Sequence, residues 1–343
     1  MPQYKLALLG FGNVGQALGR LLLRKQAELQ HHYDLTFRVT GIATDHHGCA
    51  IDPAGIDLER ALTAMAAGGE ALSTLAALPL AGDVFDFISC SEADVLFENT
   101  PVNYATGQPA VDHLRAALEL GMHAITANKG PVVHAYRQLT ELAVLQRRKF
   151  YFESAVMDGA PIFSLFREAL PAAQLRAFRG VLNSTTNLIL TRMESGESFE
   201  QAIAYAQAIG IAETDPSGDI DGWDAAVKVA ALATVLMDSP LLPAQVERQG
   251  IRGITPQEIQ RARQAGKRWK LLCSAERDGN SLRALVQPEM VSASSPLYQV
   301  DGTTSLIQFE TDVLGSLSLI ETNPGPQTTA YGLLADFLNA VKD

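Results

Sequence analysis

The chain is poor in cysteine and in positive charge. Its 343 residues contain three cysteines, Cys49, Cys90 and Cys273, which lie far apart and form no CxxC or Cys/His ligand spacing. We therefore expect neither a disulfide framework nor a zinc site. Asp and Glu number 38 against 27 Lys and Arg, which gives a formal net charge of −11. This excess of acids argues against a nucleic-acid partner and favours a small-molecule substrate.

Targeting and membrane signals are also missing. The first residues, MPQYKLALLGFG, enter a strand pattern without a basic region and a cleavage site. No apolar run approaches the roughly 18 residues that a membrane helix needs. We therefore expect a cytoplasmic protein without a membrane partner. Hydrophobic residues make up 47% of the chain, which is enough for a globular core, and the length predicts one large or two ordinary domains.

Strand and helix patterns alternate through the first 150 residues. Short apolar runs at 4–10, 35–45, 93–101 and 122–130 are each followed by a helical pattern. The helical patterns cover 13–29, 57–78, 107–121 and 132–148. This alternation predicts βαβ units and an α/β fold with a doubly wound parallel sheet.

Beyond residue 150 the pattern changes. Helices are predicted at 198–209, 222–237 and 255–265, and several strand-like runs follow them. A mixed α+β domain with antiparallel strands is therefore expected. The tail, 327–341, has the pattern of a closing helix.

A glycine motif follows the first predicted strand. Gly10, Gly12 and Gly15 form G-x-G-x-x-G between that strand and the first helix, which begins with Asn13 and Val14. Gly10 would allow the tight turn, Gly12 the approach of a pyrophosphate, and Gly15 close packing of the helix on the strand. The helix N-terminus would face the phosphates. In this context the motif predicts a Rossmann-type dinucleotide site rather than a plain glycine-rich turn.

Two further strand ends are candidates for cofactor contacts. Asp45 ends the second strand, where a carboxylate binds the adenosine ribose of NAD, and no arginine that would suit the 2′-phosphate of NADP is adjacent. NAD is therefore favoured over NADP. Asn99, Thr100 and Pro101 end a parallel strand and are expected to line the cofactor crevice.

The stretch 212–230 places five carboxylates ahead of one lysine. They are Glu213, Asp215, Asp219, Asp221 and Asp224, followed by Lys228. Asp224 and Lys228 are four residues apart and share a helical face, where a surface pair would contribute only a few tenths of a kcal/mol. Apolar residues surround this lysine, and burial would bring its pKa toward the range useful for proton transfer. Asp215 and Asp221 are interpreted as loop and helix-cap residues.

Several motifs together resemble those of homoserine dehydrogenases. They are TANKG (126–130), GVLNSTTNLILTRM (180–193), AIGIAETDPSGDIDGWDAAVKVAAL (208–232), GIRGITPQEIQRARQAGKRWKLL (250–272) and TTAYGLLADFL (328–338). The resemblance covers almost the whole chain and indicates the short, monofunctional form, without an aspartokinase or ACT domain. It implies an NAD(P)-linked interconversion of L-homoserine and L-aspartate 4-semialdehyde in threonine, methionine and isoleucine biosynthesis.

The resemblance also implies a domain plan. A Rossmann domain for NAD or NADP would span 1–148 and be completed by 322–343. A substrate-binding and dimerisation domain would span 149–321, so a homodimer is expected.

Roles for individual residues follow from the resemblance and from the chemistry of homoserine. Lys228 would be the acid/base at the hydroxyl, with Asp224 as its partner or as a substrate contact. Glu213 and Asp219 would hold the ammonium. Lys129 would lie near the nicotinamide and the reacting oxygen. Candidate active-site hydroxyls are those of Thr185 and Thr186.

Two regions near the expected cofactor site depart from the family pattern. Backbone oxygens of Glu153, Val156 and Asp158 match a monovalent-cation site, often sodium, but MDGA replaces a more glycine-rich turn. In the loop 321–330 only Gly325 clearly matches the family's cofactor-contacting loop, and the prolines on either side of it remove N–H donors.

Two alternatives stay open. A related NAD(P)-dependent oxidoreductase could act on another small amino or hydroxy acid, although Glu213 and Asp219 suit a substrate that carries an ammonium. A catalytically silent, nucleotide-sensing homologue would bind the cofactor without turnover. The presence of both Lys129 and Lys228 argues against the silent homologue, and the altered 321–330 loop argues for it.

Overall fold

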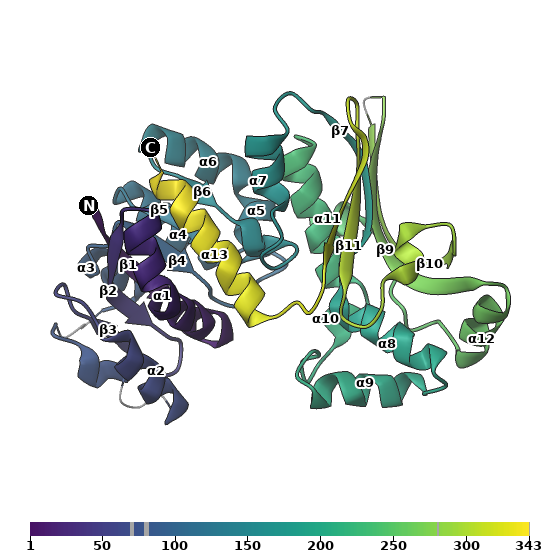
Figure 1. The fold of residues 1–343 in the computed structure, drawn as a ribbon, viewed down its shortest axis with the longest axis horizontal. Coiled ribbons are helices and arrows are strands. Elements are labelled where there is room, and N and C mark those ends of the chain that lie inside the picture. Colours follow the sequence, from purple (N-terminus) through teal and green to yellow (C-terminus); the bar gives the residue numbers. More distant parts are fainter. Residues whose placement is uncertain (69–71, 79–81, 280, 343) are drawn as a thin grey trace. The chain divides into compact units, whose positions relative to one another are not determined.

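The computed structural model describes residues 1–68, 72–78, 82–279 and 281–342 (Figure 1). They form two units: unit 1 comprises Met1–Pro161 and Gly325–Asp343, and unit 2 comprises Ile162–Pro324. The functions that we assigned to the two predicted domains, and the boundaries at 148 and 322, remain predictions.

Unit 1 contains a six-stranded sheet in the order β3-β2-β1-β4-β5-β6. Its pairs are parallel except for β2 and β3, which are antiparallel. The predicted doubly wound, Rossmann-type parallel sheet is thus confirmed. The strands are β1 (Gln3–Leu9), β2 (Thr36–Ala43), β3 (Cys49–Ile51), β4 (Val95–Glu98), β5 (His123–Thr126) and β6 (Phe150–Tyr151).

Helices cover both faces of this sheet because side chains of its strands alternate in direction. Leu6 and Leu8 of β1 face a core built with α1, α2 and α13, whereas Ala7 and Leu9 face α3 and α4. Figure 1 shows α13, from the far end of the chain, lying beside α1. The helices are α1 (Asn13–His32), α2 (Leu58–Ala66), α3 (Val84–Cys90), α4 (Ala110–Glu119), α5 (Lys129–His134), α6 (Tyr136–Leu145) and α13 (Pro326–Val341), with 3₁₀ turns η1 (Leu72–Leu75) and η2 (Glu153–Ala155).

Two predicted elements of unit 1 end earlier than the sequence suggested. The helix predicted over 57–78 ends at Ala66, close to Gly68, whose φ of +103° ends helical geometry; part of the prediction, 69–71, lies outside the described residues. The strand predicted over 122–130 ends at Thr126. Asn128 then caps α5, and its side chain accepts a hydrogen bond from the Gly130 N–H.

Unit 2 contains a mostly antiparallel sheet in the order β12-β11-β7-β9-β10-β8, as expected for the mixed domain. The two-residue strand β8 pairs in parallel with β10. The strands are β7 (Leu175–Val181), β8 (Glu247–Arg248), β9 (Lys267–Asp278), β10 (Ser281–Ser292), β11 (Ser305–Thr311) and β12 (Gly315–Glu321).

Helix α11 of unit 2 is buried on almost all of its faces. In α11 the residues on both sides of Lys228 are small and apolar and are almost inaccessible to solvent. Such a helix belongs in a core, so Lys228 is held among apolar neighbours. The helical segments are α7 (Ile162–Ser164), the π-helical η3 (Leu165–Ala169), α8 (Ser184–Glu194), α9 (Phe199–Ala208), α10 (Ser217–Ile220), α11 (Trp223–Leu236), η4 (Pro243–Gln245), α12 (Pro256–Gln264) and η5 (Pro296–Gln299).

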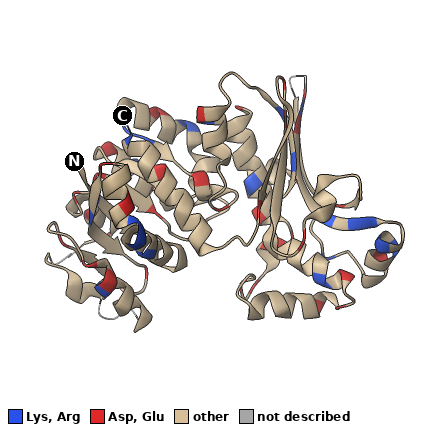
Figure 2. Cartoon of the chain, viewed as in Figure 1, with Lys and Arg blue, Asp and Glu red and all other residues tan. Residues whose placement is uncertain are grey.

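Charged residues are distributed over both units, with acidic and basic positions intermixed (Figure 2). Of the helices in the described ranges, none is long and apolar enough to cross a membrane.

Candidate active site

Two of the three glycines in the predicted cofactor loop are explained by packing within unit 1. Gly10 has a φ of +92°, and a Cβ there would lie 2.5 Å from the carbonyl oxygen of Asn99. A Cβ on Gly15 would lie 2.4 Å from the carbonyl oxygen of Gly10. Both glycines are therefore required by the fold itself.

Gly12 is different, because the described protein gives no reason for glycine there. Its φ is −78°, which any residue adopts, and a Cβ would meet no described atom within 4 Å. This open space lies at the N-terminus of α1, where unbonded backbone N–H groups attract anions. This open space agrees with the predicted approach of a pyrophosphate at Gly12. Of the other two predicted contacts, Asn13 is exposed and Val14 packs against the core.

A cavity of about 600 Å³ lies at the carboxyl ends of β1, β2 and β4. Four residues that the sequence marked as cofactor contacts, Gly10, Asp45, Thr100 and Pro101, line it together. The Asp45 carboxylate is exposed and lies 3.5 Å from Nε2 of His46. Neither Lys nor Arg occurs among the described residues that line this cavity.

Asn99 supports the presence of a polar ligand. Both polar atoms of its side chain are buried, and neither has a hydrogen-bond partner in the described part of the chain. A buried amide left unpaired costs free energy. A ligand that bonds to Asn99 would remove this cost, which fits the residue's position beside Thr100 in the expected crevice.

Lys129 occupies the first position of α5. The prediction that it lies near the carboxyl end of β5 is confirmed, but the strand predicted over 122–130 ends before it, and Lys129 belongs to a helix. It is half-buried, directly after the cap residue Asn128. The side-chain amide of Asn128 donates to the carbonyl oxygens of Thr100 and Pro101, at 3.1 and 3.4 Å. The segment that carries Lys129 is thereby tied to a wall of the cavity.

The predicted contacts near the end of the chain form a helix cap. The carboxylate of Asp158 accepts hydrogen bonds from the backbone N–H of Gly325 at 2.8 Å and from the hydroxyls of Thr328 and Thr329 at 3.2 and 3.0 Å. It thereby satisfies donors at the start of α13 and complements the helix dipole. The Gly325 N–H that a cofactor could use is already bonded.

The same carboxylate bears on the predicted cation site. Glu153 and Val156 are buried, and the side chain of Asp158 is engaged by α13. Within the described ranges, no group of three or more His, Cys, Asp and Glu side chains is arranged to hold a metal ion. The predicted ion would bind backbone oxygens rather than side chains, so it stays a prediction.

In unit 2 the acidic stretch and α8 build a compact polar cluster. Asn183, the cap residue of α8, donates from its Nδ2 to Asp219 at 2.6 Å and to Asp224 at 3.0 Å. Nζ of Lys228 lies 3.1 Å from Oδ2 of Asp224 and donates to the carbonyl oxygen of Leu182 at 2.6 Å. Three predicted site residues, Asp219, Asp224 and Lys228, thus meet around one asparagine.

The cluster carries more negative than positive charge. Two carboxylates, those of Asp219 and Asp224, share the single Lys228. Burial raises the pKa of Asp219, and the neighbouring Asp224 raises it further, although hydrogen bonds from Asn183 and Thr185 and the charge of Lys228 act in the opposite direction. The ionised form of Asp219 is therefore short of a counter-charge.

The remaining predicted residues of unit 2 lie close to this cluster or at its edge. Thr185 is buried, and its hydroxyl donates to the carbonyl oxygen of Ile211 at 3.3 Å. The hydroxyl of Thr186 is fully buried and bonds to Asn183 at 2.8 Å. The side chain of Glu213 is exposed, and its backbone carbonyl accepts from Gln207 at 3.1 Å.

Asp215 and Asp221 have local contacts that suit structural roles. Asp215 accepts the N–H of Ser217 at 3.0 Å, ahead of α10, and hydrogen bonds to Ser217 lower its pKa. Asp221 forms an ion pair with Arg252.

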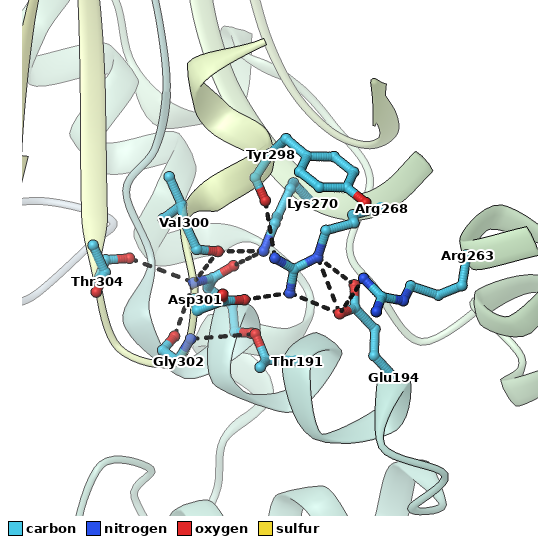
Figure 3. A network of polar contacts seen from close by, with 11 residues as sticks. Thr191, Glu194, Arg263, Arg268, Lys270, Tyr298, Val300, Asp301, Gly302 and Thr304 are labelled. Carbon is cyan, nitrogen blue, oxygen red and sulfur yellow. Dashed lines mark hydrogen bonds and ion pairs between the residues drawn. The ribbon is translucent and has the colours of Figure 1, made fainter. Parts of the chain in front are cut away.

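A buried polar network braces α8 on the side of the sheet (Figure 3). Lys270 is fully buried and donates to Oδ1 of Asn187 at 2.9 Å and to the carbonyl oxygen of Val300. Arg268 forms an ion pair with Glu194 at 2.7 Å. Burial, together with the charge of Arg268, lowers the pKa of Lys270 to about 8. The network fixes the helix whose first turn carries Thr185 and Thr186.

Sequence reasoning missed Asn183 and Glu98. Asn183 stands in the quoted NSTTN motif, and its position before a helix is a cap signal, but its bonds to two distant carboxylates could not be read from spacing. Glu98 ends β4 and is fully buried. An acid at the end of an apolar strand was the only signal for it.

A Rossmann-type fold with an open glycine loop and a buried lysine–carboxylate cluster defines a nucleotide-dependent oxidoreductase. A family model described as the NAD-binding domain of homoserine dehydrogenase matches residues 10–153, and one described as homoserine dehydrogenase matches 161–338. The chain therefore belongs to the homoserine dehydrogenase family.

Individual relatives agree with this assignment. The chain is 34% identical over 346 residues to the NAD(+)-dependent homoserine dehydrogenase of Pseudomonas canavaninivorans, covering 99% of this chain and 96% of the relative. It is 36% identical over 338 residues to the homoserine dehydrogenase of Methanocaldococcus jannaschii, covering 97% of each. The solved structure of a homoserine dehydrogenase from Thiobacillus denitrificans matches with a TM-score of 0.83 at 28% identity, covering 98% of this chain and 73% of that one.

Proposed function

We propose that the chain interconverts L-homoserine and L-aspartate 4-semialdehyde, with NAD as the preferred cofactor. The observation that carries this proposal is the cluster of Asp219, Asp224 and Lys228 around Asn183. It supplies anionic groups and a lysine amine, which are what an amino acid with a hydroxyl group needs.

The ammonium of homoserine would supply the charge that the cluster lacks. Burial and the neighbouring Asp224 raise the pKa of Asp219, so its ionised form would gain from an added positive charge. A bound ammonium would stabilise the ionised form, and such charge-assisted bonds are stronger than neutral ones. Glu213, exposed on the preceding loop, would add a second carboxylate. A plain hydroxy acid, which has no ammonium, would leave Asp219 uncompensated, so that alternative is disfavoured.

Lys228 would move the proton. Its amine has three N–H groups when charged, and two of these are engaged by Leu182 and Asp224. The third has no partner in the described part of the chain and would contact the substrate hydroxyl. During oxidation the neutral amine accepts the hydroxyl proton, and during reduction the ammonium returns it to the aldehyde oxygen. When bound, the nicotinamide supplies the hydride acceptor, and Lys129 would stabilise charge on the reacting oxygen.

The preference for NAD rests on the cavity of unit 1. Asp45 lies just beyond the end of β2, where a carboxylate can bind both ribose hydroxyls. The charged residues among the described lining are Asp45 and Asp83. Both would repel the 2′-phosphate of NADP. This repulsion disfavours NADP, although the rest of the NADP molecule would bind as NAD does.

Two further parts of the proposal rest on the resemblance. We propose a homodimer formed through unit 2, which analytical ultracentrifugation of the purified chain would test. We also propose a monovalent cation at the backbone oxygens of Glu153, Val156 and Asp158. Equal turnover in sodium and in a bulky organic cation at matched ionic strength would refute the cation.

The test of the activity is absorbance at 340 nm with purified protein, L-homoserine and either NAD or NADP. We expect reduction with both substrates present and a higher kcat/KM for NAD. A folded protein that binds NADH but reduces neither cofactor would refute the proposal and support the silent nucleotide-sensing homologue. Reduction with a plain hydroxy acid in place of homoserine would refute the assigned role of Asp219.

A further inference from the structure

A closed ring of hydrogen bonds joins the two loops that follow β4 and β5. Glu98, the last residue of β4, is fully buried. Its Oε1 accepts the N–H of Thr100 at 3.0 Å and also the Thr100 hydroxyl. The hydroxyl of Thr126, the last residue of β5, is shared between Oε2 of Glu98 at 2.9 Å and the backbone carbonyl oxygen of Glu98 at 2.8 Å.

Asn128 completes the ring. Its N–H donates to the hydroxyl oxygen of Thr126 at 2.9 Å, and its side-chain amide donates to the carbonyl oxygen of Thr100 at 3.1 Å. The ring therefore runs from Glu98 through Thr126 and Asn128 to Thr100 and back to Glu98. Every bond lies within unit 1.

Two members of this ring, Thr100 and Asn128, adjoin parts of the proposed active site. Thr100 and the following Pro101 line the cofactor cavity. Asn128 is the cap of α5, whose first residue is Lys129. A change in the ring would therefore move the cavity wall and the lysine together, although Glu98 is not among the described residues that line the cavity.

We propose that Glu98 is a positioning residue, which sets Lys129 and the cavity wall at Thr100 through Thr126 and Thr100. This inference rests on the function proposed above. A buried carboxylate is costly unless it is hydrogen-bonded, and Glu98 accepts three bonds from two loops. The imidazole of His113 lies 3.9 Å from the same carboxylate, and its Nδ1 is buried without a partner among the described residues. The carboxylate thus holds both loops at one point.

The decisive variant is Thr126→Val, which keeps the side-chain shape and removes the link between Glu98 and Asn128. Thr40→Val is the matched control, because Thr40 is also fully buried in the same sheet and its hydroxyl has no partner among the described residues. We expect kcat of Thr126→Val to fall by about 10- to 100-fold, since small displacements of reacting groups cost this much. Thr40→Val should keep the wild-type kcat.

A second variant separates the geometry of the ring from its charge. In Glu98→Gln the amide oxygen can accept from Thr100 and the NH₂ can donate to Thr126, whose oxygen still accepts from Asn128. The ring is kept and the charge is lost, so kcat should stay near that of the wild type. A loss as large as in Thr126→Val would show that the charge acts directly, and would overturn the positioning role.

A double-mutant cycle tests whether the ring acts through Lys129. In the Lys129→Ala background, Thr126→Val should cause a clearly smaller fall in kcat, because only its effect through the cavity wall remains, while its effect on the urea midpoint should be unchanged. An equal fall in both backgrounds would show a general structural defect and refute the inference. Turnover of the wild-type protein in the same assay distinguishes failure of the proposed function from failure of this inference. Its absence refutes the proposed function and this inference with it, whereas its presence with an unaffected Thr126→Val refutes this inference alone.

Discussion

The replacement of Lys228 by methionine separates a structural role of this lysine from a chemical one. The charged atoms of Lys228 and Asp224 are 3.1 Å apart, and only 15% and 10% of the two side chains are exposed. With an effective dielectric constant of about 20, this distance gives an attraction of about 5 kcal/mol. Desolvation of both groups offsets part of it, and removal of one partner from such a pair costs about 3 kcal/mol.

Lys228→Met should therefore lower the free energy of unfolding by about 3 kcal/mol, because Asp224 is left buried without its cation. Adding Asp224→Asn should restore most of this stability, since the neutral amide needs no counter-charge. Turnover should behave differently. It should fall by about 10²–10⁴-fold in the single variant, as acid/base losses do, and stay low in the double variant.

Urea unfolding gives the stability of each variant, and NADH formation at 340 nm with saturating homoserine gives turnover. Direct NADH binding by fluorescence serves as a control and should be unchanged in both variants. Turnover that returns together with stability in the double variant would refute the reasoning, because Lys228 would then be a structural residue only. Near-normal turnover in Lys228→Met would refute it as well.

Three further outcomes are expected. Asp45→Ala should raise KM for NAD by about tenfold and leave KM for NADP nearly unchanged, as loss of a charge-assisted bond implies; equal effects would contradict the ribose contact. Burial and Asp224 raise the pKa of Asp219, so the folded protein loses stability as pH rises from the unfolded pKa through that raised pKa. Asp219→Asn should therefore keep or raise the thermal midpoint at pH 7, while KM for homoserine rises. A lower midpoint with unchanged KM would contradict this. The pKa of Lys270 is lowered to about 8 from 10.5, so the unfolded chain binds more protons between these values and stability should rise over that interval, by on the order of 3 kcal/mol. Lys270→Met should lack this increment in urea unfolding, and an identical pH dependence would refute the shift.

Much of the fold could be predicted because it depends on local patterns. The strand–helix alternation before residue 150 and the glycine motif follow from spacing alone, and both are found in unit 1. Local signals also set the limits of the prediction. Gly68 ends α2 before the Ala-rich pattern does, and Asn128 starts a helix inside a run that reads as a strand. In both places one residue's backbone preference outweighs the hydrophobic pattern around it.

The candidate site was only partly visible in the sequence. The i,i+4 spacing of Asp224 and Lys228 predicts their ion pair, because helical geometry fixes it. The bonds of Asn183 to Asp219 and Asp224 join positions 36 and 41 residues apart. No local rule fixes such a contact, since it depends on how β7, α8 and α11 pack. The commitment of the Gly325 N–H to Asp158, 167 residues away, is of the same kind.

The sequence by itself determined the residue types and local geometry that this chemistry needs: an open Gly12 at a helix N-terminus, a lysine within an apolar helix, and carboxylates ahead of it. Tertiary structure alone decided which of those groups share an environment. It placed Asp219 beside Asp224, where burial and like charge raise its pKa, and left Glu213 exposed. It also buried Glu98 between two loops. The physical reason is that backbone preferences act over a few residues, whereas burial and charge act between neighbours in space, whatever their separation in the chain.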